Sequence, residues 1–249
     1  MKMDEQKGLD WREQLEMETG IHFRTVNPEE IEKESFLTIK KELGEAFLAS
    51  YPKEQLPVLL RVIHTTADFS YRDSLVFANG AMEAANQAIQ RGLPIITDTT
   101  MAASGINKGA ASAFGVSVRC FVGDEDVREE AKRRGVTRSA VSAEKAARLY
   151  PECIYAVGNA PTALIRLYEL IREGRFRPAL IIGMPVGFVN VAEAKELILK
   201  TGLPVIAAMG RKGGSNTAAA VCNALLRIAG ENRIAGENRI AGEKQKKEE

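Results

Sequence analysis

Five short runs of this sequence are apolar at nearly every position, and longer stretches with helical spacing separate them. Strands that are buried on both faces carry such unbroken apolar runs, because helices cover both sides of the sheet. Strands that alternate with helices are typical of parallel sheets. We therefore predict one α/β domain in which a mainly parallel five-stranded sheet has helices on both faces. The expected strands lie at 93–97, 116–122, 153–157, 179–182 and 203–208.

A helical part is expected ahead of this sheet, and a different kind of segment after it. Helical patterns cover about 27–50, 53–64 and 73–91. Three consecutive hexamers, RIAGEN, RIAGEN and RIAGEK, begin at Arg227. Their period of six matches no packing face, and a glycine in each copy weakens a helix by about 1 kcal/mol. We predict an N-terminal extension at 1–25, the α/β domain at 26–228, and a repetitive, disordered and solvated tail at 229–249, with a functional tail as the alternative.

Composition narrows the classes of function. The net charge is +1 with both signs interspersed, unlike the basic face of a nucleic-acid-binding protein. No apolar run is long enough to predict a membrane span, and the charged first twenty residues do not resemble a secretory signal. Three widely spaced cysteines, Cys120, Cys153 and Cys222, lie among apolar residues and indicate buried free thiols in a reducing cytoplasm. With two histidines and no paired cysteines, we expect no protein-bound metal and no cofactor.

Glycine-rich and polar segments follow four of the predicted strands. They are TDTTM (97–101), GNAPT (158–162), GMPVGF (183–188) and MGRKGGS (209–215). Ligands of open parallel sheets bind beyond the carboxyl ends of the strands, where glycines allow close approach of backbone N–H groups. Together these loops predict a broad, amide-lined crevice that suits a large polycarboxylate better than a mononucleotide. Cationic side chains for carboxylates are available at Arg61, Arg138, Arg211 and Lys212.

The segment GRKGGSNT allows two interpretations. It could be an anion cradle with two cationic side chains, or a glycine-rich turn with Ser215 or Asn216 as a helix cap. It is not a P-loop, because no Gly-Lys-Ser/Thr follows a spaced glycine.

His64 ends an apolar helical run, three residues after Arg61, so both side chains share one face of that helix. It could act as a general acid or base beside an arginine that fixes an anionic ligand. It could equally be a partly buried histidine that caps the turn, with Thr65, Thr66 or Asp68 as its partner. Spacing alone leaves both possibilities open. His22 is expected to be structural or exposed, and no nucleophile elbow or Cys–His pair indicates covalent catalysis.

Six motifs together closely resemble the precorrin-8X methylmutase family over about 26–226. They are RVIHTTADF, ITDTTMAASGI, TRSA, VGNAPTAL, IIGMPVGFVNVAEAK and GRKGGS. The resemblance implies an isomerase of cobalamin biosynthesis that moves a methyl group from C-11 to C-12 of precorrin-8 or cobalt-precorrin-8. The product would be hydrogenobyrinate, or cobyrinate when cobalt is already present. His64, in the RxxH motif, would be the acid that protonates the macrocycle, and Ser35 and Arg61 would contact the substrate.

Position and resemblance together assign further residues to the substrate pocket. These are Asp98, Thr99, Thr100, Arg138, Asn159, Gly183, Met184, Arg211, Gly213, Gly214 and Ser215. The loop HTTADF, where some relatives carry HACGS, favours the cobalt-bearing substrate. The resemblance also implies a homodimer whose second subunit partly closes the pocket. Two rival hypotheses remain: a non-catalytic tetrapyrrole carrier, and a phosphate- or nucleotide-binding α/β enzyme that uses GRKGGSNT.

Overall fold

The computed structural model describes residues 11–22, 27 and 29–248 of the chain. They fall into two compact units that divide between Thr38 and Ile39. The first unit contains helix α1 (Trp11–Thr19) and the first part of α2 (Ile31–Leu43). Part of the expected extension, 1–10 and 23–25, lies outside the described residues. His22 is exposed and lies 2.9 Å from Glu16, which confirms that it is a surface residue.

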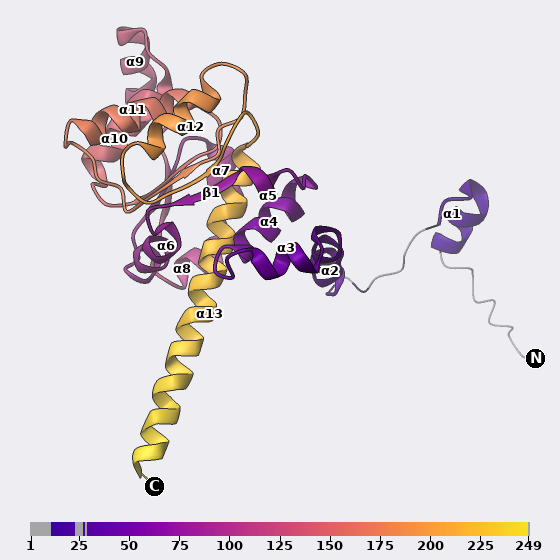
Figure 1. Cartoon of the computed structure of the whole chain (residues 1–249). Coiled ribbons are helices and arrows are strands. Elements are labelled where there is room, and N and C mark those ends of the chain that lie inside the picture. Colours follow the sequence, from indigo (N-terminus) through magenta and orange to yellow (C-terminus); the bar gives the residue numbers. More distant parts are fainter. Residues whose placement is uncertain (1–10, 23–26, 28, 249) are drawn as a thin grey trace, which may run out of the picture. The chain divides into compact units, whose positions relative to one another are not determined.

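A six-stranded sheet forms the centre of the second unit, with the strand order β1-β6-β5-β4-β2-β3 (Figure 1). Five strands run parallel and correspond to the five predicted ones. The central strands β4, β5 and β6 are buried at every position, as their unbroken apolar runs predict. The bounds are β1 (Leu75–Ala78), β2 (Ile95–Thr97), β3 (Val118–Cys120), β4 (Ile154–Val157), β5 (Leu180–Gly183) and β6 (Val205–Ala208).

The sixth strand corrects the prediction of a continuous helix over 73–91. β1 pairs antiparallel with β6, Leu75 opposite Ala208, and the helix begins only afterwards at Ala81. Asn79 and Gly80 both have left-handed backbone conformations, with φ of 55° and 70°. Asn and Gly adopt this conformation more readily than other residues, so the pair ends the strand and separates it from the helix.

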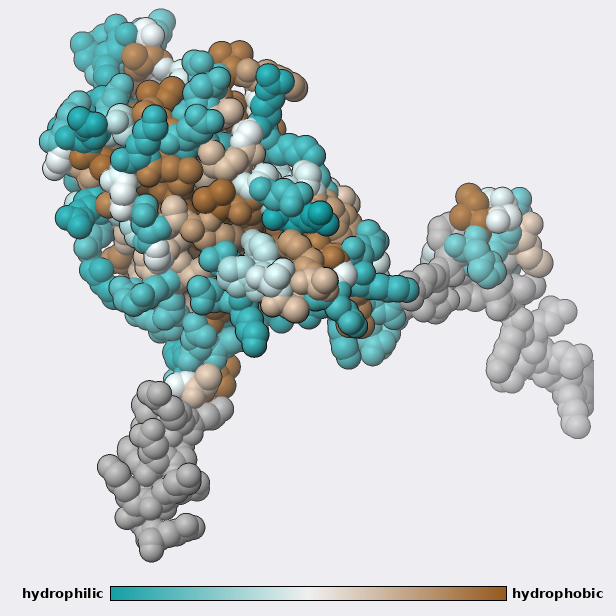
Figure 2. Space-filling model, in the orientation of Figure 1, coloured by the Kyte–Doolittle hydropathy of each residue, from teal (hydrophilic) through white to brown (hydrophobic). Residues whose placement is uncertain are grey.

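Helices cover both faces of the sheet, as predicted. Figure 1 shows α9, α10, α11 and α12 on one face, and α4, α6, α8 and α13 on the other. The helices of this unit not yet bounded are α3 (Glu45–Ser50), α4 (Leu56–Thr66), α5 (Tyr71–Ser74), α6 (Ala81–Gln90), α7 (Thr100–Gly105), α8 (Lys108–Ser112), α9 (Glu125–Arg134), α10 (Arg138–Leu149), α11 (Pro161–Arg172), α12 (Val191–Leu199) and α13 (Ser215–Glu248). On the face of the molecule in Figure 2, hydrophilic and hydrophobic side chains are interspersed.

Helix α13 begins in the core and continues through the repeats. Its first part buries side chains such as Val221, Leu225 and Leu226 against α4, α6 and α7. From Glu231 to Ala235 the side chains are exposed, which agrees with a solvated segment. The helix nevertheless extends to Glu248, which differs from the predicted disordered tail at 229–249. A helix that packing has already nucleated adds further residues at little cost, because nucleation is the unfavourable step.

The three cysteines are free, and Cys153 and Cys222 are buried, as predicted; Cys120 is only partly buried. Burial raises the pKa of the Cys222 thiol to about 12 and also raises that of Cys153. Among the described residues, no helix is long and apolar enough to cross a membrane.

Candidate active site

The carboxyl ends of the five parallel strands lie along one edge of the sheet. At the neighbouring strands β2 and β4, the chain connects to strands on opposite sides. From β2 it continues to the neighbour β3 on one side, whereas from β4 it continues to β5 and β6 on the other. Such a switch point leaves a crevice between the two loops that follow the strands, and it is the usual ligand site of open α/β sheets.

A pocket of about 460 Å³ opens at this switch point. It is lined by Asp98, Thr99, Thr100, Arg138 and Asn159, five of the predicted site residues, together with Val122, Thr137, Ser139, Ala160 and Thr162. A larger pocket of about 650 Å³ lies beside Phe77, Gly80 and Asn232. β1 is antiparallel, and its last residue Ala78 pairs with Val205, the first residue of β6. The larger pocket is therefore near the amino ends of the parallel strands, away from the predicted loops, and we place the site in the smaller one.

Asp98 stabilises the backbone that forms one wall of this pocket. Its side chain is fully buried, and Oδ1 accepts a hydrogen bond from the N–H of Gly158 at 2.7 Å. Oδ2 accepts from the N–H groups of Asn159 and Ala160 at 2.9 and 2.8 Å. Burial raises the pKa of the Asp98 carboxyl, and the three N–H donors oppose that rise because they favour the carboxylate. The oxygens face backbone, so Asp98 shapes the β4–α11 loop instead of offering its carboxylate to a ligand.

Thr99 and Ser215 connect the first and last loops of the site. The two hydroxyls lie 2.8 Å apart, and the Thr99 hydroxyl also caps α7 by accepting from the N–H of Ala102 at 3.1 Å. Gly158 packs beneath this contact, where a Cβ atom would lie 2.6 Å from the Cα of Ser215. Only glycine fits at that distance, so the loops after β2, β4 and β6 are in direct contact.

The predicted glycines of the last two loops also meet. The N–H of Gly214 donates to the carbonyl of Met184 at 2.8 Å, and the N–H of Gly187 donates to the carbonyl of Arg211 at 3.2 Å. A Cβ at Gly213 would lie 2.3 Å from the Met184 carbonyl oxygen. Met184 itself is buried, so its backbone rather than its side chain belongs to the site, and Gly183 is the last residue of β5. Arg211 extends to the surface, with its guanidinium carbon 5.7 Å from the ring centre of Phe188.

His64 lies in the last turn of α4 and is half-buried, as is Arg61 one turn earlier. Val58, Leu59, Val62 and Ile63 of this helix are completely buried and fix it to the core. The helix ends at Ala67, whose left-handed backbone lets its N–H bond to the carbonyl of Ile63.

The three residues considered as partners of His64 each make polar contacts of their own. The hydroxyls of Thr65 and Thr66 donate to the carbonyls of Arg61 and Val62, at 2.9 and 2.8 Å. Asp68 binds Lys212, and this bond is the largest cause of the lowered pKa of its carboxyl. These contacts fix the side chains of the segment that follows His64.

Lys212 joins the segment after His64 to the β6–α13 loop. Its Nζ lies 2.6 Å from Oδ2 of Asp68 and donates to the hydroxyl of Ser70 at 2.9 Å. The N–H of Met209 also donates to the carbonyl of Ser74 at 2.7 Å. These contacts hold the C-terminal end of α4 at the sheet edge that carries the pocket. Ser35, the other predicted contact, lies on α2 in the N-terminal unit.

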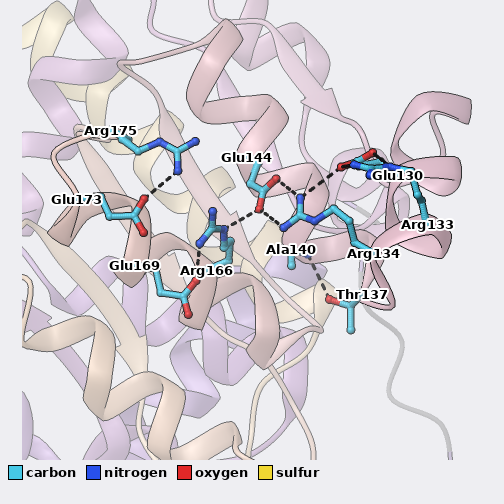
Figure 3. A network of polar contacts seen from close by, with 10 residues as sticks. All are labelled: Glu130, Arg133, Arg134, Thr137, Ala140, Glu144, Arg166, Glu169, Glu173 and Arg175. Carbon is cyan, nitrogen blue, oxygen red and sulfur yellow. Dashed lines mark hydrogen bonds and ion pairs between the residues drawn. The ribbon is translucent and has the colours of Figure 1, made fainter.

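Arg138 starts α10, and its backbone is fixed by neighbouring polar contacts. Thr137 caps the helix by accepting from the N–H of Ala140, and its hydroxyl lies 2.8 Å from that of Thr162 on α11. Figure 3 shows the ion-pair network beside this cap, in which Glu144 binds both Arg134 and Arg166. The network connects α9, α10 and α11. The helix that begins at Arg138 is therefore held by ion pairs to both of its neighbouring helices.

No group of three His, Cys, Asp or Glu side chains converges as metal ligands would, within the part of the chain that the structure describes. The residues that line the pocket offer threonine and serine hydroxyls, the side-chain amide of Asn159 and the guanidinium group of Arg138. Such donors suit a ligand that carries several carboxylates.

Comparisons with known proteins identify the family of this chain. Residues 30–228 match the model of the precorrin-8X methylmutase family. The chain is 42% identical to the cobalt-precorrin-8 methylmutase of Priestia megaterium, over 86% of this chain and 94% of that protein. It is 43% identical to the cobalt-precorrin-8 methylmutase of Leptospira interrogans, over 80% and 93%. The crystal structure of the precorrin-8X methylmutase from Thermus thermophilus superposes with a TM-score of 0.74 at 39% identity, over 82% and 98%.

The fold and the matches together define an isomerase with an open α/β sheet. The chain belongs to the precorrin-8X methylmutase family. It is an enzyme of cobalamin biosynthesis that converts a precorrin-8X-type tetrapyrrole into a hydrogenobyrinate-type corrin. The predicted family, fold class and isomerase activity are confirmed, which argues against the carrier and the nucleotide-binding alternatives.

Proposed function

We propose that His64 is the acid that starts the methyl migration by protonating the tetrapyrrole. The observation that carries this proposal is the anchoring of Asp68 and Ser70 by Lys212, because it ties the segment after His64 to the loops of the site. A proton on the conjugated macrocycle withdraws electron density and lowers the barrier to a [1,5]-sigmatropic shift. Acid assistance of this kind contributes about 10²–10⁴-fold in rate.

The step balances without a redox partner. The bond between the methyl group and C-11 breaks, a bond to C-12 forms, and the proton that His64 donates is returned afterwards. Substrate and product therefore contain the same atoms and electrons. Binding the macrocycle in one geometry supplies the remaining rate enhancement, because the migrating methyl group needs a fixed path across the ring edge.

The substrate carboxylates would be bound by cationic and hydroxyl side chains around the crevice. Guanidinium groups at Arg61, Arg138 and Arg211 are suited to bidentate binding of carboxylates. Polar contacts are proposed at Thr99, Thr100, Asn159 and Ser215. The family resemblance alone proposes Ser35 as a further substrate contact. The backbone of Gly183, Met184, Gly213 and Gly214 is proposed to shape the floor of the same crevice.

Replacing His64 with asparagine tests the acid. H64N keeps a polar side chain of similar size but cannot donate a proton from an imidazolium. We expect conversion of cobalt-precorrin-8, followed by its visible spectrum, to fall about 10²–10⁴-fold while corrin binding persists. H22N, at the other histidine of the chain, is the matched control and should retain full activity. Turnover of H64N within threefold of the parent enzyme would contradict the proposal.

We also propose that the natural substrate carries cobalt. The loop HTTADF supports this preference, and the relatives from Priestia megaterium and Leptospira interrogans are both named for cobalt-precorrin-8. The test compares kcat/KM for cobalt-precorrin-8 and for the metal-free compound in the same preparation. A higher kcat/KM for the metal-free compound would reverse the assignment.

A homodimer in the cytoplasm is the proposed working form, with no nucleic-acid partner. The exposed apolar side chains of Ile31 and Leu37 on α2 support a protein contact, and the free thiols suit a reducing compartment. Sedimentation equilibrium should give twice the chain mass of 27.2 kDa. The variant I31E/L37E should shift the population toward the monomer, and a monomeric parent enzyme would refute the dimer.

A further inference from the structure

Lys195, on α12, is a fully buried lysine. Its Nζ donates to the carbonyl of Gly210 at 2.9 Å and to the carbonyl of Lys212 at 2.7 Å. Within the described part of the chain it forms no ion pair with a carboxylate. Lysine is almost never buried unless it is paired, because removing an ammonium group from water is unfavourable. Such a residue needs a reason other than packing.

The two carbonyls belong to Gly210 and Lys212, the residues on either side of Arg211. They lie in the loop that carries Gly213 and Gly214 against Met184. The same loop sends the side chain of Lys212 to Asp68 and Ser70, in the segment after His64. Because Lys195 binds the backbone of Lys212 itself, it fixes the point from which that side chain leaves the loop.

We propose that Lys195 is a positioning residue for the reaction. By holding the carbonyls of Gly210 and Lys212, it keeps Lys212 in place to anchor the segment after His64. The contribution to catalysis rests on the proposed role of His64, whereas the control of the loop does not. Lys195 would act through Lys212 and never touch the substrate.

The kinetic test uses K195M, which keeps the length of the side chain but removes its donors. We expect kcat to fall about 10–100-fold in the folded enzyme, since displacing a catalytic group by about 1 Å can cost 10²-fold. KM should change less than kcat. K200M is the matched control, because Lys200 is exposed at the C-terminal end of α12, and it should behave as the parent enzyme. K195Q retains an amide donor and should lose less than K195M; if K195M fails to fold, K195Q is compared with K200M on the same scale.

A double-mutant cycle separates positioning from general stability. K212M alone should also lower kcat, and K195M/K212M should lie within about threefold of K195M, because the second change removes a contact that the first has already released. Losses that multiply, or a folded K195M with kcat within threefold of the parent enzyme, would overturn the proposal.

Hydrogen exchange provides a readout that is independent of the acid. The N–H groups of Gly187 and Gly214 form hydrogen bonds between the β5–α12 loop and the β6–α13 loop. Both N–H groups should exchange at least about tenfold faster in K195M than in K200M. If H64N proves fully active, the acid assignment fails, and faster exchange in K195M still supports control of the loop. Unchanged exchange in folded K195M would refute that control.

Discussion

The β4–α11 loop and the β6–α13 loop lie side by side, and each is held by a fully buried charged side chain of opposite sign. Asp98 accepts three backbone N–H groups from the first loop, whereas Lys195 donates to two backbone carbonyls of the second. The amides at 158–160 are therefore already used. Lys195 forms hydrogen bonds only with carbonyl groups of the β6–α13 loop and with none of its N–H groups. The two loops therefore differ in the backbone groups that the buried side chain uses, N–H groups in the first and carbonyls in the second.

The largest effect is expected when the buried anion is removed. D98A leaves the N–H groups of Gly158, Asn159 and Ala160 without their acceptor. An unsatisfied buried donor costs about 1–3 kcal/mol. Gly158 is buried, whereas Asn159 and Ala160 are partly accessible to water, so the free energy of unfolding should fall by about 3–5 kcal/mol, less than three fully buried donors would cost. Urea denaturation monitors the change. D126A, at an exposed aspartate that binds Lys145, is the control and should cost less than about 1 kcal/mol. A loss below 1 kcal/mol in D98A would show that the β4–α11 loop does not depend on Asp98.

Lys195 should make the free energy of unfolding depend on pH. Burial lowers the pKa of Lys195 from 10.5 to about 8. Between these pH values the unfolded chain retains a proton that the folded chain has lost, so the free energy of unfolding rises with pH. The rise amounts to about 3 kcal/mol at most, at about 1.4 kcal/mol for each unit of pKa. Unfolding of the parent enzyme and of K195M is measured from pH 7.5 to 10.5, and only the parent should gain this increment. Parallel curves would show that Lys195 titrates as an exposed lysine.

These two charged residues also show what the sequence can predict. The five parallel strands and the polar loops after them were predicted, because an apolar run and its following glycines are local features. β1 was missed because its partner β6 lies far along the chain and because the Asn79-Gly80 turn was not recognised as a helix break. The convergence of Asp98, Thr99 and Asn159 on one pocket follows from the rule for strand ends, whereas Arg138, at the start of α10, was assigned with the help of the family resemblance.

The role of Asp98 could not be predicted in the same way. Its position at a strand end indicated a ligand contact, but the direction of its carboxylate depends on a loop 60 residues later. Lys195 did have a signal in the sequence. Val191, Ala194 and Ile198 form the buried stripe of α12 at helical spacing, and Lys195 falls within that stripe. A lysine in an apolar stripe indicates a buried polar contact, although its acceptors 15 and 17 residues away remain unpredictable.

Substituting one glycine in each loop tests how tightly the β4–α11 and β6–α13 loops are packed. An added Cβ would lie 2.6 Å from backbone at Gly158 and 2.3 Å from backbone at Gly213. Overpacking of this kind typically costs about 1–3 kcal/mol. G158A and G213A should each lower the free energy of unfolding by about this amount and reduce turnover, because the backbone must shift at the site. If only one of them is tolerated, the loop that contains it is the more adaptable of the two.

The smallest effect is expected at a glycine with free space, which calibrates the loop substitutions. Gly236 lies in the repeat region of α13, and a Cβ there would meet nothing within 4 Å. Alanine is favoured over glycine in a helix by about 1 kcal/mol, so G236A should raise the helix content at 222 nm and leave turnover unchanged. The gain in global stability should stay below about 1 kcal/mol, because an added Cβ at Gly236 would contact nothing within 4 Å. A loss of helix content would mean that Gly236 faces a partner surface, and the repeat would then be a contact element rather than a solvated extension of the helix.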